Sequence, residues 1–89
     1  MPVVWIPSLL RSLTRGEEKV NAAGSTVRQV IDSLETEFPG LRARLCDGER
    51  IRQDIAVVVD GITSYQGMRQ PVNEDSVVHF LPVIRGGLV

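Results

Sequence analysis

The chain has 89 residues, 43% of them hydrophobic and 24% charged, with a formal net charge of -1 at pH 7. This length and composition are those of one small globular domain and argue against disorder. Acidic and basic residues are interspersed without a basic stripe, which argues against nucleic-acid binding, and no apolar run approaches the roughly 20 residues of a membrane span.

The N-terminal residues alternate in a pattern that predicts a β-hairpin. Residues 3–6 form a β-branched and aromatic run, which indicates a first strand. Residues 8–15 contain enough apolar side chains for one helical turn or a structured loop. Residues 17–23 place Val20 and Ala22 on one face and polar side chains on the other, which predicts a second, half-exposed strand paired with the first.

A helix over residues 26–38 is the clearest predicted element. Its apolar side chains recur at i, i+3, i+4, i+7 and i+11, which is the period of one helical face: Val27, Val30, Ile31, Leu34 and Phe38. Thr26 and Gln29 fit a capping box at its start, and Pro39-Gly40 ends it. A single amphipathic helix of this length needs a sheet to cover its apolar face.

The second half of the chain predicts two principal strands and a short one. Residues 55–59 form a continuous apolar run, which indicates a strand buried on much of both faces. Asp60-Gly61 is a tight-turn signal before a short edge strand over residues 62–65. The last strand is predicted over residues 77–81.

The segments between these elements are expected to be connections. Residues 41–46 predict a short helical turn, residues 49–53 are charged and loop-like, and residues 66–75 form a loop. The resulting order of elements is that of an α+β, β-grasp (ubiquitin-like) fold. In that fold a mixed four- to five-stranded sheet has its first and last strands adjacent and parallel at the centre, with one main helix packed across one face. We expect residues 1–82 to form this domain and residues 83–89 to form a flexible tail.

The tail contains Gly86-Gly87 followed by a two-residue extension, Leu88-Val89. Paired glycines outside a turn usually mark a flexible end, because glycine loses the most backbone entropy on ordering. They also make the narrowest peptide, able to enter a channel that any Cβ would block. A frayed terminus without function is the alternative interpretation.

No catalytic constellation is visible in the sequence. A Cys-His pair would require Cys46 and His79 to be brought together, and nothing around Cys46 predicts an activated thiolate. The single cysteine excludes an internal disulfide and a multi-Cys metal site, and a lone histidine is not a metal site. Asp54 and Asp60 flank a strand as turn residues. We therefore expect a protein that is not an enzyme and binds no metal or cofactor; because it lacks a signal-peptide pattern, we expect a cytoplasmic location.

Alternation along the last strand separates two faces of the sheet. If Val78 and Phe80 point at the helix, His79 and Leu81 lie on the open face beside the tail. One interpretation of His79 is an ordinary exposed histidine. The other is that His79 and Leu81 belong to a docking patch that presents the tail to a partner enzyme.

The end of the chain resembles that of the MoaD/ThiS sulfur-carrier proteins, whose last strand is followed by Pro-Val-x-x-Gly-Gly, here Pro82-Val83-Ile84-Arg85-Gly86-Gly87. Other stretches are similar to the MoaD branch: Gly24-Ser25-Thr26-Val27, Leu34-Glu35, Pro39-Gly40-Leu41 and Asp75-Ser76-Val77. The likeness is greatest to CysO-type carriers, whose pattern resembles Ile6-Pro7, Leu10-Arg11, Val30-Ile31 with Leu34-Glu35, and Arg44-Leu45 with Asp47. The resemblance covers nearly the whole chain.

This resemblance implies a protein cosubstrate whose catalytic groups belong to its partners. In the family, an E1-like adenylyltransferase/sulfurtransferase uses ATP to convert the carrier's terminal glycine carboxylate to an acyl-adenylate. A sulfur donor then displaces AMP and leaves a thiocarboxylate, from which a second enzyme takes the sulfur. Mapped onto this sequence, Gly87 bears the sulfur and Gly86 keeps the approach narrow. The residues that line the channel are Val83, Ile84 and Arg85.

The chain departs from the family pattern after Gly87, because Leu88-Val89 make the Gly87 carbonyl an amide that cannot be adenylated. The resemblance implies that a JAMM-type zinc metalloprotease cleaves between Gly87 and Leu88, since some members carry a short extension that such an enzyme removes. An inactive carrier and a cloning remnant are the alternatives.

The acceptor of the sulfur is not specified by the sequence. The likeness to CysO-type carriers favours cysteine formation on a PLP-dependent cysteine synthase, while molybdopterin, thiamine and secondary-metabolite synthesis stay open. Two other classes of function also stay open at this point. One is a ubiquitin-like modifier that forms isopeptide bonds with lysines of other proteins, and the other is a non-catalytic β-grasp interaction module.

Overall fold

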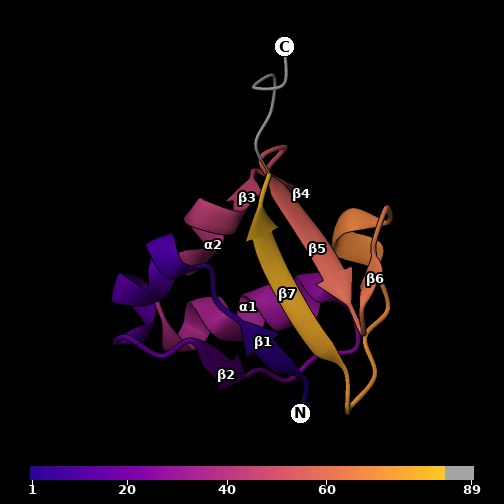
Figure 1. The fold of residues 1–89 in the computed structure, drawn as a ribbon, viewed down its shortest axis with the longest axis horizontal. Helices are drawn as coiled ribbons and strands as arrows, with labels where there is room; N and C mark the ends of the chain where they lie inside the picture. Colours follow the sequence, from indigo (N-terminus) through magenta and orange to yellow (C-terminus); the bar gives the residue numbers. More distant parts are fainter. Residues whose placement is uncertain (84–89) are drawn as a thin grey trace.

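A five-stranded mixed sheet with one main helix across a single face forms the fold (Figure 1). The computed structural model describes residues 1–83. Its strands are β1 (Val3–Trp5), β2 (Lys19–Asn21), β3 (Cys46–Asp47), β4 (Arg50–Ile51), β5 (Ile55–Val59), β6 (Ile62–Thr63) and β7 (Val77–Pro82). Its α-helices are α1 (Val27–Glu37) and α2 (Leu41–Leu45), and its 3-10 helices are η1 (Ser8–Thr14) and η2 (Gly67–Arg69). None of the helices in this described part is long and apolar enough to cross a membrane.

The strand order β2-β1-β7-β5-β6 confirms the predicted topology. The first strand, β1, pairs antiparallel with β2 and parallel with β7, with Val4 opposite Val78. The last strand, β7, therefore lies at the centre and pairs antiparallel with β5 on its other side. In Figure 1 helix α1 passes behind β7, so the face of the sheet towards the viewer, which we call the open face, is not covered by α1. This is the β-grasp arrangement.

The apolar stripe of α1 forms the centre of the core, as predicted. Its five side chains are each at most 2% exposed: Val27, Val30, Ile31, Leu34 and Phe38. The sheet contributes buried side chains to the same cluster, among them Val4, Ile6, Val57, Val78 and Phe80. Burial alternates along β5, where Val57 and Val59 are buried while Ala56 and Val58 are only half-buried. The prediction that β5 is buried on much of both faces is thus only partly correct, because the open face has no helix over it.

The capping box at the start of α1 forms in a modified way. The hydroxyl of Thr26 accepts the backbone N–H of Gln29 at 3.3 Å, as predicted. The Gln29 side chain, however, accepts the N–H and hydroxyl of Ser25, at 2.8 and 2.9 Å, and not the N–H of Thr26. Gly24 allows this tight entry, since a Cβ there would lie 2.7 Å from the backbone nitrogen of Val30.

The charged segment after α2 is not the loop that we predicted. Strands β3 and β4 form a small antiparallel ladder in which Cys46 pairs with Ile51 and Asp47 with Arg50. Gly48 turns this hairpin with a φ of +65°, a conformation that glycine adopts without strain. Two-residue strands are too short for alternation to reveal them, so the sequence pattern had no signal for this hairpin. Similarly, the predicted loop over residues 66–75 contains the 3-10 helix η2.

The turn between β5 and β6 ties the hairpin to the start of β7. Asp60 and Gly61 both have positive φ, +53° and +83°, as a two-residue type I′ turn requires. The Asp60 carboxylate accepts the Ser76 hydroxyl at 2.8 Å and the Val77 backbone N–H at 2.9 Å. These hydrogen bonds hold the pKa of Asp60 below its ordinary value, and the one from the Val77 N–H has the larger effect.

This lowered pKa predicts a pH dependence of stability that Asp60→Asn reduces. Because Asp60 is a stronger acid in the folded chain, the unfolded chain binds more protons at low pH. The stability that Asp60 contributes is therefore complete above the unfolded pKa of about 3.9 and is lost as the pH falls through the folded pKa. Asparagine keeps the size of the side chain and tolerates the positive φ. Urea unfolding at pH 7 and pH 3 should show a smaller loss of stability for Asp60→Asn than for the parent. Equal losses in the two proteins would contradict the assignment.

Candidate functional site

Strand β7 ends at Pro82, at the end of the molecule opposite the N-terminus (Figure 1). Val83, which we predicted as the first tail residue, still donates its backbone N–H to the Asp54 carbonyl oxygen at 2.8 Å. Pairing therefore continues past Pro82, while the Val83 side chain is 40% exposed. The other predicted tail and processing residues lie outside the described residues: Ile84, Arg85, Gly86, Gly87, Leu88 and Val89.

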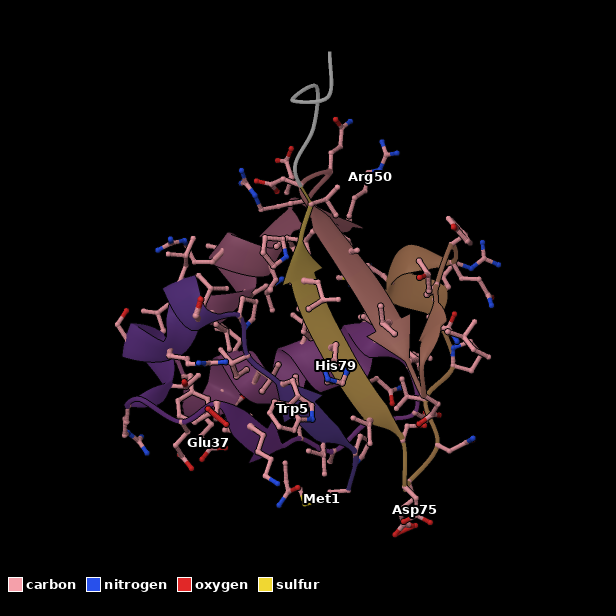
Figure 2. The ribbon with its side chains drawn as sticks, in the orientation of Figure 1. Met1, Trp5, Glu37, Arg50, Asp75 and His79 are labelled. Atoms are coloured by element: carbon pink, nitrogen blue, oxygen red, sulfur yellow. The ribbon has the colours of Figure 1, made fainter. Side chains whose placement is uncertain are left out.

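The open face of the sheet carries a column of stacked side chains across β1 and β7. Trp5 on β1 and His79 on β7 lie opposite each other in the parallel ladder. Their rings stack with centroids 5.5 Å apart and planes 4° apart, as Figure 2 shows. The ammonium group of Lys19 lies 5.5 Å from the centroid of Trp5, within the range of a cation–π contact. Leu81 follows on the same face and is 43% exposed.

The predicted division of β7 into two faces is confirmed. Val78 and Phe80 are buried at 0% and 1% exposure, while His79 is half-buried and Leu81 is exposed. Sequence reasoning named His79 and Leu81 but missed Trp5. Alternation places Trp5 on the face of β1 that is opposite to the face of buried Val4, so the face of Trp5 could be predicted. Its contact with His79 could not be predicted, because that contact depends on the register between β1 and β7, which the sequence pattern alone does not specify.

A groove of about 510 Å³ opens beside the exit of the tail. It lies between η1 and the ends of β1 and β7, and Arg44 and Arg52 complete its walls. We call it the tail groove, and its principal lining residues are Leu9, Arg11, Arg44, Arg52, Phe80 and Leu81. Sequence reasoning did not predict it, because its walls come from segments that are far apart in the chain.

The other residues considered for chemistry have structural surroundings. Cys46 is buried in the core, and this burial raises the pKa of its thiol. His79 lies on the open face, so the fold does not assemble Cys46 and His79 as a pair. Asp54 accepts the Arg52 side chain at 3.1 Å, and Asp60 holds the turn described above. Within residues 1–83, no group of three or more His, Cys, Asp or Glu side chains could hold a metal ion.

Comparison with known proteins places this geometry in a family. The ThiS family model matches residues 4–87. The sulfur carrier protein CysO of Mycobacterium tuberculosis is 29% identical over 89 residues, covering 94% of this chain and 96% of the relative. The crystal structure of that CysO superposes with a TM-score of 0.88 at 27% identity, over 94% of this chain and 100% of that one.

A second solved structure is similar over nearly the whole chain. It is the crystal structure of the Amycolatopsis orientalis BexX/CysO complex, with a TM-score of 0.91 and 34% identity over 98% of this chain and 100% of the matched one. Family model, sequence relatives and structures agree on the same kind of protein. The chain belongs to the ThiS family and is a sulfur carrier, a protein cosubstrate rather than a catalyst.

Proposed function

We propose that the chain carries sulfur as a thiocarboxylate on Gly87. The observation that supports this most directly is that the family match ends at residue 87, two residues before the chain does. An E1-like adenylyltransferase/sulfurtransferase uses ATP to adenylate the Gly87 carboxylate, and a sulfur donor displaces AMP. The carrier itself needs no bound cofactor for this, because ATP and the sulfur donor are substrates of its partner.

Reach and width suit the tail to this role. Four residues beyond Val83 span at most about 14 Å when fully extended, which is enough to carry Gly87 away from the domain surface into a partner's active site. In this proposal Val83, Ile84 and Arg85 line the partner's channel. Gly86 keeps the approach to the reacting carbonyl narrow.

Adenylation first requires that the extension be removed. With Leu88-Val89 in place, the Gly87 carbonyl is part of a peptide bond and has no carboxylate oxygen to attack ATP. We propose a JAMM-type zinc metalloprotease as the enzyme that cleaves between Gly87 and Leu88.

Intact mass spectrometry tests the whole sequence of steps. The 89-residue chain is incubated with candidate protease, E1-like enzyme, ATP and sulfide. The expected product has lost two residues and gained the mass difference of sulfur for oxygen. A chain that is neither trimmed nor thiocarboxylated by any such enzyme set would refute the proposal, and Gly-Gly remnants on lysines of other proteins would instead favour a protein modifier.

For the sulfur acceptor, we propose a PLP-dependent cysteine synthase, which the likeness to CysO carriers supports. The thiocarboxylate form is mixed with the synthase and its amino-acid substrate. The product, in which the carrier is joined to cysteine through an acyl bond, is detected by intact mass, and cysteine is measured after hydrolysis of that bond. A molybdopterin or thiamine synthase, or an enzyme of secondary metabolism, that consumes the thiocarboxylate when the cysteine synthase does not would overturn this choice of pathway.

We further propose that His79 and Leu81 belong to the surface on which partners dock. Both lie on the open face of β7, where Leu81 directly precedes Pro82 at the end of the strand and the stack with Trp5 holds the His79 ring in one orientation. Leu81→Ser is expected to raise the KM of the E1-like enzyme for the carrier about tenfold, or ~1.4 kcal/mol, as for an interface anchor.

The matched control for this prediction is Ile62→Ser. Ile62 is 73% exposed on the edge strand β6, so the substitution removes a similar aliphatic side chain from a surface away from the tail. Its KM should equal that of the parent. If Ile62→Ser and Leu81→Ser changed KM alike, exposed apolar area in general would explain the effect and the docking surface would be wrong.

A further inference from the structure

The tail groove carries more positive charge than the described chain neutralises. Three arginines line it against a single carboxylate, Asp54. Arg52 is engaged with that carboxylate at 3.1 Å. Arg11 is also occupied, since its Nε donates to a backbone carbonyl at 3.1 Å. The side chain of Arg44, by contrast, makes no hydrogen bond or ion pair with any residue of the described range 1–83, although it is exposed at the groove.

The same groove is flanked by exposed aliphatic side chains. Leu9 on η1 is 81% exposed and Leu81 on β7 is 43% exposed, and both line the groove. Leu10 and Phe80, which belong to the buried core, also line the groove and add to its apolar surface. A carboxylate that meets a guanidinium group gains a charge-assisted hydrogen bond, and this pair is strengthened when aliphatic side chains of a bound segment pack beside it and keep water away.

The position of the groove indicates what kind of molecule reaches it. Leu81 and Pro82 line it directly before the tail begins. Any protein that takes residues 84–87 into a channel must place its own surface around this rim, so the groove is continuous with the proposed docking surface at His79 and Leu81.

We propose that the tail groove binds a segment of the partner protein in which a carboxylate side chain stands next to an aliphatic one. The carboxylate pairs with Arg44, and the aliphatic side chain packs against Leu9 and Leu81. This inference rests on the proposed function in one respect only, namely that the partner is a protein that receives the tail. Arg44 then acts in recognition of the partner and not in the chemistry at Gly87.

The deciding experiment is an NMR titration of the ¹⁵N-labelled 89-residue chain with two peptides, acetyl-Ala-Leu-Glu-Leu-Ala amide and its Gln counterpart. The Glu peptide should cause saturable shifts in the amides of Leu10, Arg44 and Leu81. The Gln peptide should bind at least about tenfold more weakly, as expected for loss of a charge-assisted pair. Equal affinity of the two peptides, or no saturable shift in the groove, would overturn the proposal.

Two variants locate the effect. Arg44→Gln removes the charge, keeps most of the length and should reduce the affinity for the Glu peptide to that for the Gln peptide. Arg50→Gln is the matched control, because Arg50 lies at the same end of the molecule in Figure 2 but does not line the groove. Equal effects of the two substitutions would show a general charge effect and contradict a specific site.

A third arm separates a protein segment from a simple anion. Sodium phosphate at the same ionic strength should leave the Leu10 and Leu81 amides unshifted, since it has no apolar part. If phosphate saturated the same shifts as the Glu peptide, the groove would be an anion site and the proposal would fail. The titration contains no enzyme, so its outcome is independent of whether Gly87 becomes a thiocarboxylate. Failure of the groove proposal can therefore be distinguished from failure of the sulfur-carrier proposal.

Discussion

Replacing Phe80 by alanine is expected to lower the free energy of unfolding by about 3–5 kcal/mol. Phe80 is 1% exposed on the central strand β7, within the core that α1 covers, so the substitution leaves a cavity in addition to removing apolar surface from burial. A domain of this size has only about 5–15 kcal/mol of stability in total. Urea unfolding followed by circular dichroism should therefore show a variant whose transition midpoint lies at a much lower urea concentration than that of the parent.

The neighbouring residue provides the control for this prediction. Leu81→Ala removes a similar apolar mass one position further along β7, but from the open face, where Leu81 is 43% exposed. Its cost should be below about 1 kcal/mol, as for most exposed substitutions. Comparable losses for Phe80→Ala and Leu81→Ala would mean that the two faces of β7 are wrongly assigned, and with them the proposed docking surface.

The parts of the fold that could be predicted are those in which a long periodic pattern meets a clear boundary. The apolar stripe of α1 begins at Val27, directly after the Thr26 cap, and spans three turns, so both the helix and its buried face followed from the sequence. The tight turn at Asp60-Gly61 likewise required positive φ at both positions. The β3–β4 hairpin could not be predicted, because two residue pairs carry no measurable period.

For the candidate site, the sequence could predict the face of the sheet on which a residue of one strand lies, but not the contacts between strands. Period-two alternation assigned His79 and Leu81 to the open face without any knowledge of their neighbours. The stack of Trp5 on His79 depends on the register of a parallel pair separated by most of the chain. The tail groove depends further on where η1 and α2 pack, and this is decided by tertiary contacts that a one-dimensional pattern does not contain.

The chain shortened to end at Gly87 is expected to be adenylated without any protease, whereas the 89-residue chain is not adenylated at all until it is cleaved. The difference is all-or-none because adenylation needs a free carboxylate oxygen as the nucleophile toward ATP. In the full chain the Gly87 carbonyl is an amide, and the carboxylate at Val89 stands two residues further out with a side chain next to it. ATP–pyrophosphate exchange with the E1-like enzyme measures the step directly.

A shortened chain with Gly86→Ala distinguishes the need for a free carboxylate from the need for a narrow tail. It has the same terminal carboxylate as the shortened parent but adds a Cβ beside the reacting residue, so exchange should fall while binding through the folded domain persists. Exchange by the full chain at the rate of the shortened one would refute the processing proposal, because Val89 would then serve as the acceptor. If only the shortened chain reacts, Gly87 is the residue whose carboxylate is adenylated, and Leu88-Val89 keep the carrier inactive until a protease frees that carboxylate.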